Sequence, residues 1–109
     1  MARVVRLTVL AMLLFATQPL GAQVARDVAQ GREFAQRVCA ACHAIRPGAA
    51  LSPVVAAPTF SAIAATPGMS PIALRVALQS VHRTMPNFAL TGAELDDVIA
   101  YIMSLQRRN

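Results

Sequence analysis

The segment Cys39-Ala40-Ala41-Cys42-His43 determines how the rest of this sequence is interpreted. Its C-x-x-C-H spacing is typical of covalent attachment of a c-type haem. On a helix, positions i, i+3 and i+4 lie on one face, so the two thiols and the imidazole can approach a ligand from the same side. Each cysteine can form a thioether with one haem vinyl group. We therefore expect haem attachment at Cys39 and Cys42, with His43 as an axial iron ligand.

Three other chemistries explain less of this segment. A structural zinc site needs four ligands, usually arranged as two separated pairs, and His82 is the one further obvious candidate. A thioredoxin-like redox pair belongs in an alternating strand and helix pattern, and no convincing strand follows the N-terminal region. A simple disulfide between Cys39 and Cys42 leaves the adjacent His43 without a role.

The N-terminal residues have the pattern of an export signal. Two arginines precede an apolar run over residues 7–16, which is too short to span a bilayer as a helix. We expect a secretory signal peptide at residues 1–22 and a single domain at residues 23–109. The expected location is the periplasm, with no transmembrane anchor after cleavage. Cleavage after Ala25 and an uncleaved tether are the alternatives.

The composition indicates a small basic domain that is not a nucleic-acid-binding protein. The full chain has a formal net charge of +5, and all ten of its basic residues are arginine. Without Arg3 and Arg6 of the expected signal peptide, eight arginines and five acidic residues leave +3. These arginines form no basic run, and aromatic residues are sparse, so the pattern typical of nucleic-acid binding is missing. A chain this short buries a limited core and often needs a cofactor to stabilise it. A covalently held haem would add apolar surface to that core.

Capping residues and apolar spacing predict three main helices. The first begins at Asp27 and leads into the C-x-x-C-H motif, the second begins at Ser70-Pro71 and runs through about Val81, and the third begins at Thr91. Gly31 in the first helix suggests close approach of another helix. The apolar faces expected for the three helices consist of Val28, Gly31, Ala35, Val38 and Cys42; of Leu74, Leu78 and Val81; and of Leu95, Val98, Ile99, Ile102 and Leu105.

The segment from Pro47 to Leu74 contains no charged residue and is rich in proline and glycine. This composition argues against a long regular element and suits a segment that wraps an apolar group. We expect one short helical turn within it, at Phe60–Ala65. The predicted fold class is therefore all-α, with three to four helices and long loops around one covalently attached haem.

An iron bound by His43 has a sixth position, and its ligand influences function. Met/His ligation raises the reduction potential and is typical of electron transfer. Met85 is the preferred sixth ligand because it lies in a loop, whereas Met103 lies in a strongly helical stretch and is expected to be a packing residue. His82, Met69 and an open position are the alternatives.

Several short segments together resemble the small bacterial class I c-type cytochromes, the monohaem cytochrome c family, over nearly all of residues 23–109. Besides Cys39–His43, these segments are Gly31–Phe34, Ala57–Phe60, Thr84–Phe88 and Asp97–Ile102. The resemblance implies a cytochrome c fold, in which the helix of Gly31 and Phe34 crosses the helix of Tyr101. It also implies that the Pro58 carbonyl accepts the His43 Nδ1 proton, and it supports Met85 as the sixth ligand.

The resemblance implies an exported, non-enzymatic carrier of single electrons with one haem c. Its partners would be redox protein donors and acceptors in the bacterial cell envelope, among them a dehydrogenase or a terminal oxidase. The carrier would be a monomer or a subunit of a complex. Because the chain contains no lysine, a docking surface would consist of arginine and apolar residues. The alternatives are a five-coordinate or labile-ligand haem sensor or enzyme, and a haem subunit of a larger dehydrogenase or oxidase complex.

Overall fold

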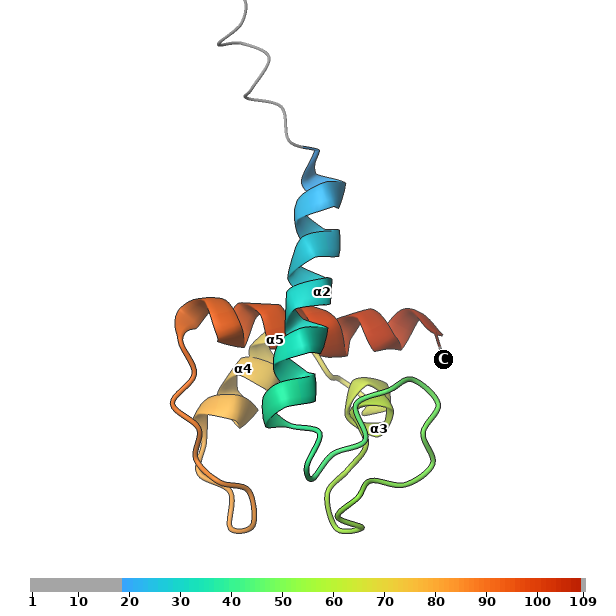
Figure 1. The fold of residues 1–109 in the computed structure, drawn as a ribbon, viewed down its shortest axis with the longest axis vertical. Helices are drawn as coiled ribbons and strands as arrows, with labels where there is room; N and C mark the ends of the chain where they lie inside the picture. Colours follow the sequence, from blue (N-terminus) through green and yellow to red (C-terminus); the bar gives the residue numbers. More distant parts are fainter. Residues whose placement is uncertain (1–18, 109) are drawn as a thin grey trace, which may run out of the picture.

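The computed structural model describes residues 19–108, which form helices joined by long loops (Figure 1). In chain order the elements are α2 (Leu20–Val38), α3 (Phe60–Ala65), α4 (Pro71–Gln79), α5 (Gly92–Ser104) and the 3-10 helix η1 (Leu105–Arg108). These residues contain no strand, which confirms the all-α fold class. The predicted signal peptide lies outside the described residues up to position 18. No helix in the described part of the chain is long and apolar enough to cross a membrane.

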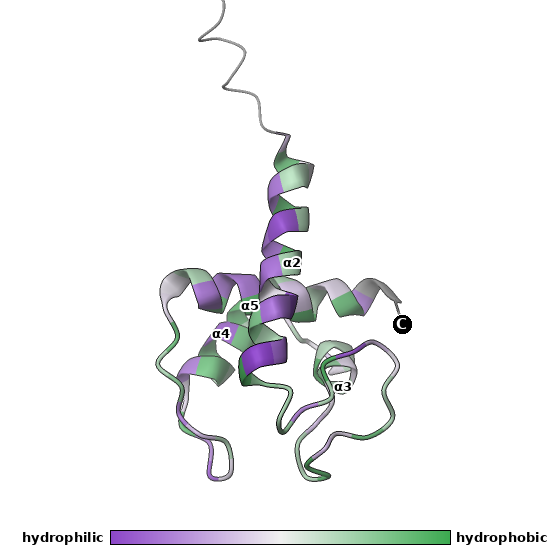
Figure 2. Cartoon of the chain, viewed as in Figure 1, coloured by the Kyte–Doolittle hydropathy of each residue, from purple (hydrophilic) through white to green (hydrophobic). Residues whose placement is uncertain are grey.

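The core lies where the other helices meet α5. Figure 2 shows hydrophobic and hydrophilic residues alternating along α2 and α5, as expected of helices that bury one face. The apolar face predicted for the last helix is confirmed, and Tyr101 joins it in the core. The buried hydrophobic side chains are Phe34, Ala35, Ile45, Phe60, Ala64, Leu74, Leu95, Val98, Ile99, Tyr101, Ile102 and Leu105.

The crossing of α2 and α5 depends on Gly31. A Cβ atom at this position would lie 1.8 Å from the Asp97 carbonyl oxygen and 2.9 Å from the Tyr101 Cβ. Only a residue without a side chain allows the two backbones to approach this closely. The predicted close approach is therefore confirmed. It offsets the cost of a glycine within a helix, which is about 1 kcal/mol relative to alanine.

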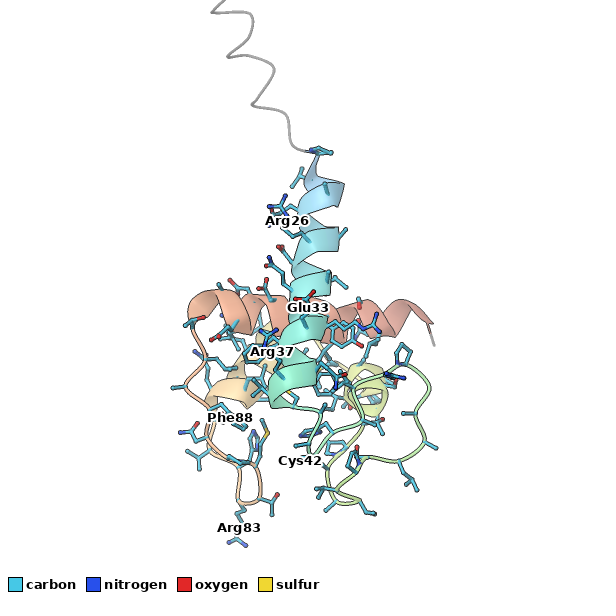
Figure 3. The ribbon with its side chains drawn as sticks, viewed as in Figure 1. Arg26, Glu33, Arg37, Cys42, Arg83 and Phe88 are labelled. Atoms are coloured by element: carbon cyan, nitrogen blue, oxygen red, sulfur yellow. The ribbon has the colours of Figure 1, made fainter. Side chains whose placement is uncertain are left out.

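The first helix begins earlier than predicted, at Leu20 rather than at Asp27. The intervening residues contain no proline, and the one glycine among them, Gly21, lies in the first turn. The helix starts after Pro19 without a side-chain cap. Asp27 does not cap the helix; its carboxylate instead accepts a hydrogen bond from Gln23 Nε2 at 2.6 Å. The additional turns project beyond α5, with Arg26 on their exposed surface (Figures 1 and 3).

The helix after the uncharged segment ends earlier than predicted. The α4 helix begins after Ser70, whose Oγ accepts from the Ala73 N–H at 3.1 Å, as its sequence suggested. It stops at Gln79 because Ser80 has an extended backbone conformation, with φ −94° and ψ 148°. Leu74 is buried, as predicted, whereas Val81 is 81% exposed and does not continue the apolar face.

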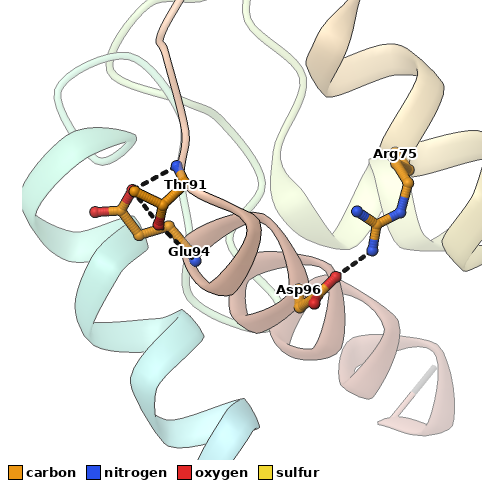
Figure 4. A network of polar contacts seen from close by, with 4 residues as sticks. All are labelled: Arg75, Thr91, Glu94 and Asp96. Carbon is orange, nitrogen blue, oxygen red and sulfur yellow. Dashed lines mark hydrogen bonds and ion pairs between the residues drawn. The ribbon is translucent and has the colours of Figure 1, made fainter.

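Side-chain caps define the start of α5. Thr91 Oγ1 accepts from the Glu94 N–H at 3.3 Å, and Glu94 Oε2 accepts from the Thr91 N–H at 2.9 Å, which confirms the predicted capping box (Figure 4). The hydrogen bond from the Thr91 backbone lowers the pKa of the Glu94 carboxyl. An exposed ion pair between Arg75 and Asp96 links α4 to α5. Exposed pairs of this kind contribute about 0–1 kcal/mol, so packing dominates this contact.

We expect Gly31→Ala to lower the free energy of unfolding by about 1–3 kcal/mol, because the new methyl group forces α2 and α5 apart. Denaturant unfolding of the haem-loaded protein measures this change. Gly92→Ala is the matched control, since a Cβ at Gly92 has no heavy atom within 4 Å. Equal unfolding midpoints for the two variants would contradict the role of Gly31.

Candidate functional site

The C-x-x-C-H motif follows directly on the end of α2. Cys39 is the C-cap of the helix, and its N–H donates to the Ala35 carbonyl at 2.8 Å. The His43 N–H then donates to the Cys39 carbonyl at 2.9 Å, so the backbone continues through one more turn. The motif therefore keeps both cysteines and the histidine within a single turn that continues α2.

Both cysteines are free thiols and are half-buried. Burial raises the pKa of the Cys39 thiol to about 11, which makes this thiol a poor nucleophile in disulfide exchange at neutral pH. The described residues also contain no group of three or more His, Cys, Asp or Glu side chains arranged to hold a metal ion. The zinc and thioredoxin-like interpretations therefore gain no support from the geometry.

His43 is oriented by the residue that precedes the cap of α3. Its Nδ1 lies 2.7 Å from the Pro58 carbonyl oxygen, and because this oxygen is an acceptor, Nδ1 carries the hydrogen. In the neutral imidazole, Nε2 then has a free lone pair that can bind a metal. The ring also packs near Phe60, with ring centroids 5.8 Å apart. Two independent contacts thus hold the imidazole in place.

The loop of residues 44–59 is tied back to the motif at several points. The Val54 N–H donates to the Cys42 carbonyl at 3.2 Å, and the Phe60 N–H donates to the Ala44 carbonyl at 2.9 Å. Ser52 is buried, and its Oγ accepts from the Ala44 N–H at 3.0 Å. Ser52 was not identified from the sequence, because a single serine in a proline-rich segment has no periodic pattern to mark it.

Tyr101 connects the same loop to α5. Its buried hydroxyl donates to the Ile45 carbonyl at 2.7 Å, two residues after His43. The Tyr101 ring also lies 6.2 Å from the Phe60 ring, measured between centroids. The helix that crosses α2 therefore also fixes the position of the chain that leaves the motif.

Met85 lies on the separate loop between α4 and α5. Of residues 81–89, Met85 alone is half-buried, and the others are exposed. The alternative candidates lie elsewhere or have other partners. Met69 and Met103 are partly buried and pack against the helical core, whereas the exposed His82 donates from Nε2 to the Ala77 carbonyl at 2.6 Å.

The residues of the site fit a haem. Two thiols and one imidazole with a free Nε2 are the donors that covalent attachment and axial coordination require. Both loops also expose large apolar side chains. Figure 3 shows Phe88 on the loop of residues 80–91, with Arg83 at its far tip. Such side chains can pack against a flat apolar group. The exposed large hydrophobic residues of the two loops are Leu51, Val54, Val55, Val81 and Phe88.

Two comparisons with known proteins match most of the chain. Residues 26–102 match the family described as cytochrome c oxidase, cbb3-type, subunit III. The chain is 36% identical over 83 residues to cytochrome c-552 of Bradyrhizobium diazoefficiens, which covers 76% of this chain and 79% of that protein. No solved structure matches. The residues matched by the family extend from α2 to α5 and include both cysteines, His43 and Met85.

We expect Tyr101→Phe to lower the free energy of unfolding by about 1–3 kcal/mol, because the buried Ile45 carbonyl loses its hydrogen-bond donor. The phenyl ring keeps the packing against Phe60, so the change isolates the hydroxyl. Chemical denaturation of the haem-loaded protein measures it. An unchanged unfolding midpoint would show that the hydroxyl does not hold this loop.

Proposed function

This chain belongs to the cbb3-type cytochrome c oxidase subunit III family of small monohaem c-type cytochromes, and we propose that it is an exported electron carrier with His43 and Met85 as axial ligands. The observation that carries this proposal is the 2.7 Å contact between His43 Nδ1 and the Pro58 carbonyl, directly beside two free thiols. This contact leaves Nε2 of His43 free for the iron. The cofactor is a covalently bound haem c.

Cys39 and Cys42 would hold the haem through two thioethers. Each S–H adds across the carbon–carbon double bond of a vinyl group, with the sulfur bonded to one carbon and the hydrogen to the other, so no oxidant or reductant is needed. When bound, the haem supplies one-electron chemistry through the Fe(III)/Fe(II) couple. The protein then controls axial ligation, burial and hydrogen bonding around the iron.

His43 and Met85 would act as unequal partners on the two sides of the iron. Donation from Nδ1 to the Pro58 carbonyl fixes the tautomer and ring orientation of His43 and increases the donor strength of Nε2. As an iron ligand, the Met85 thioether would favour the ferrous state and raise the reduction potential. With His43 and Met85 both holding the haem, the cofactor would supply one-electron transfer with little rearrangement of the protein.

The proposed location is the periplasm, after removal of residues 1–22 as a signal peptide. The basic start and the short apolar run in the sequence support export. The proposed partners are redox protein donors and acceptors, among them a dehydrogenase or a terminal oxidase. Arg46 and Arg83 lie on the two loops, and all five acidic residues lie on α2 and α5. A partner surface with carboxylates or apolar groups would therefore complement the loops.

A second candidate function is that of a haem subunit in a larger oxidase complex. The description of the matching family, as a subunit of a cytochrome c oxidase, favours it. Affinity purification of the tagged chain from its native membranes separates the two functions. Stoichiometric recovery of oxidase subunits supports the complex, and a haem protein recovered alone supports the free carrier.

We expect Met85→Ala to keep the haem attached, to open the sixth position and to lower the reduction potential. The measurement is the visible spectrum of the dithionite-reduced protein before and after addition of carbon monoxide. At a concentration that saturates the variant, the wild-type spectrum should remain unchanged. Met69→Ala and Met103→Ala are the controls, and in both the sixth position should stay closed to carbon monoxide. Two results would exclude Met85 as the ligand: a Met85→Ala protein that does not bind carbon monoxide, or a wild-type protein that binds carbon monoxide as well as Met85→Ala does.

We expect Cys42→Ala to reduce covalent haem loading and stability after expression with a haem-attachment system. Denaturing mass spectrometry measures loading, because the covalently attached haem remains on the chain after unfolding. Full loading with unchanged thermal stability would show that Cys42 is not an attachment point.

A further inference from the structure

We propose that His82 is a positioning residue that holds the loop carrying Met85 against the end of α4. This inference rests on the proposed function, because the group being positioned is the Met85 thioether. His82 would act through the loop backbone and would not touch the iron. Its hydrogen bond would set how often Met85 leaves the sixth position.

The loop has little polar attachment to the rest of the molecule. Within residues 81–89 of the described chain, the one hydrogen bond to a helix is the 2.6 Å contact from His82 Nε2 to the Ala77 carbonyl of α4. The Leu90 N–H donates to the Phe88 carbonyl at 3.1 Å, but this bond is local to the end of the loop. His82 is therefore the tether between the helix and the segment that contains Met85.

Packing does not replace this tether. A depression of about 280 Å³ separates the end of α4 from the returning part of the loop, and it is lined by Leu78, Gln79, residues 87–90 and Leu95. The neighbours of Met85 on both sides are exposed. Apart from the half-buried Met85 and the contacts that a bound haem would supply, no further hydrogen bond joins residues 81–89 to a helix, so loss of the His82 contact would free the loop to move at its start.

The hydrogen bond from His82 is made at the C-terminal end of α4, where a helix needs donors. The last carbonyls of a helix lack intrahelical donors, and a cationic or N–H-bearing side chain is favourable at this end. Here the Ala77 carbonyl also accepts from the Ser80 N–H at 3.2 Å, and Ser80 Oγ donates to the Val76 carbonyl at 2.6 Å. Ser80 thus caps the helix, whereas His82 joins the helix to the loop three residues before Met85.

Cyanide binding to the ferric, haem-loaded protein tests this role, because cyanide binds only when the sixth position is open. We expect His82→Ala to increase the apparent cyanide affinity about fivefold, the change that corresponds to loss of one ordinary hydrogen bond. His82→Gln keeps an N–H donor of similar reach and should restore an affinity close to that of wild type. The unfolding free energy alone would not separate the tether from a simple helix cap.

Two matched control variants separate the His82 hydrogen bond from the effects of changing other residues near the end of α4. Ser80→Ala removes a side-chain hydrogen bond from the same helix end, and Arg83→Ala truncates an exposed neighbour. Both should leave the cyanide affinity unchanged. A fivefold increase in either control, an unchanged affinity in His82→Ala, or no restoration in His82→Gln would overturn the inference.

Met85→Ala distinguishes failure of this inference from failure of the proposed ligation. If wild type binds cyanide more weakly than Met85→Ala but as weakly as His82→Ala, the ligation stands and the His82 tether is wrong. If wild type and Met85→Ala bind cyanide equally, the ligation itself is wrong. If the sixth position is fully open to cyanide in His82→Ala but not in Met85→Ala, His82 is the iron ligand and does not act by holding the loop.

Discussion

The close approach of α2 and α5 at Gly31 is the constraint on which the rest of the structure depends. At this point the α2 backbone lies against the Asp97 carbonyl, so the direction of α2 relative to α5 is set by backbone contact. The end of α2 then carries the cysteines, and α5 carries Tyr101. The Tyr101 hydroxyl holds the Ile45 carbonyl, which fixes the chain that leaves the motif. One helix crossing therefore positions both the thiols and the loop that orients the imidazole of His43.

The two loops are attached to the helices in different ways, and this difference matches their proposed roles. The loop of residues 44–59 is joined to the motif and to α5 by several hydrogen bonds, and it includes Pro58, whose carbonyl accepts from His43. The loop that contains Met85 has one hydrogen bond to α4 within residues 81–89 of the described chain. The imidazole of His43 is thus held firmly and the thioether of Met85 loosely. Of the two proposed iron ligands, Met85 would therefore be the one that leaves the iron more often. The weakly anchored loop is the expected site of local opening, because few contacts oppose it.

Local sequence signals succeeded where the interactions that make an element are themselves local. The capping box of Thr91 and Glu94 joins residues three apart, and Ser70 caps α4 in the same way. These signals failed where nothing local sets a boundary. Asp27 resembled a helix cap, but the helix continues back to Leu20, because residues 22–26 also form helix readily and Gly21 falls in the first turn. The end of α4 at Gln79 likewise depends on the backbone conformation of Ser80, which apolar spacing does not report.

The sequence by itself determined the all-α class, the haem-attachment motif and the apolar face of α5, because spacing along a helix dictates which side chains share a face. It also indicated a close helix contact at Gly31, although it did not identify the atoms that meet there. Only the tertiary structure decided that Ser52 and Tyr101 hold the loop around His43 and that His82 joins the Met85 loop to α4. The Tyr101 contact reaches across 56 residues of the chain, whereas the Ser52 contact closes eight residues of the loop on itself. The His82 contact spans few residues, but it forms only because the helix ends and the chain turns back. Such pairings depend on the folded path of the backbone, which no periodic pattern encodes.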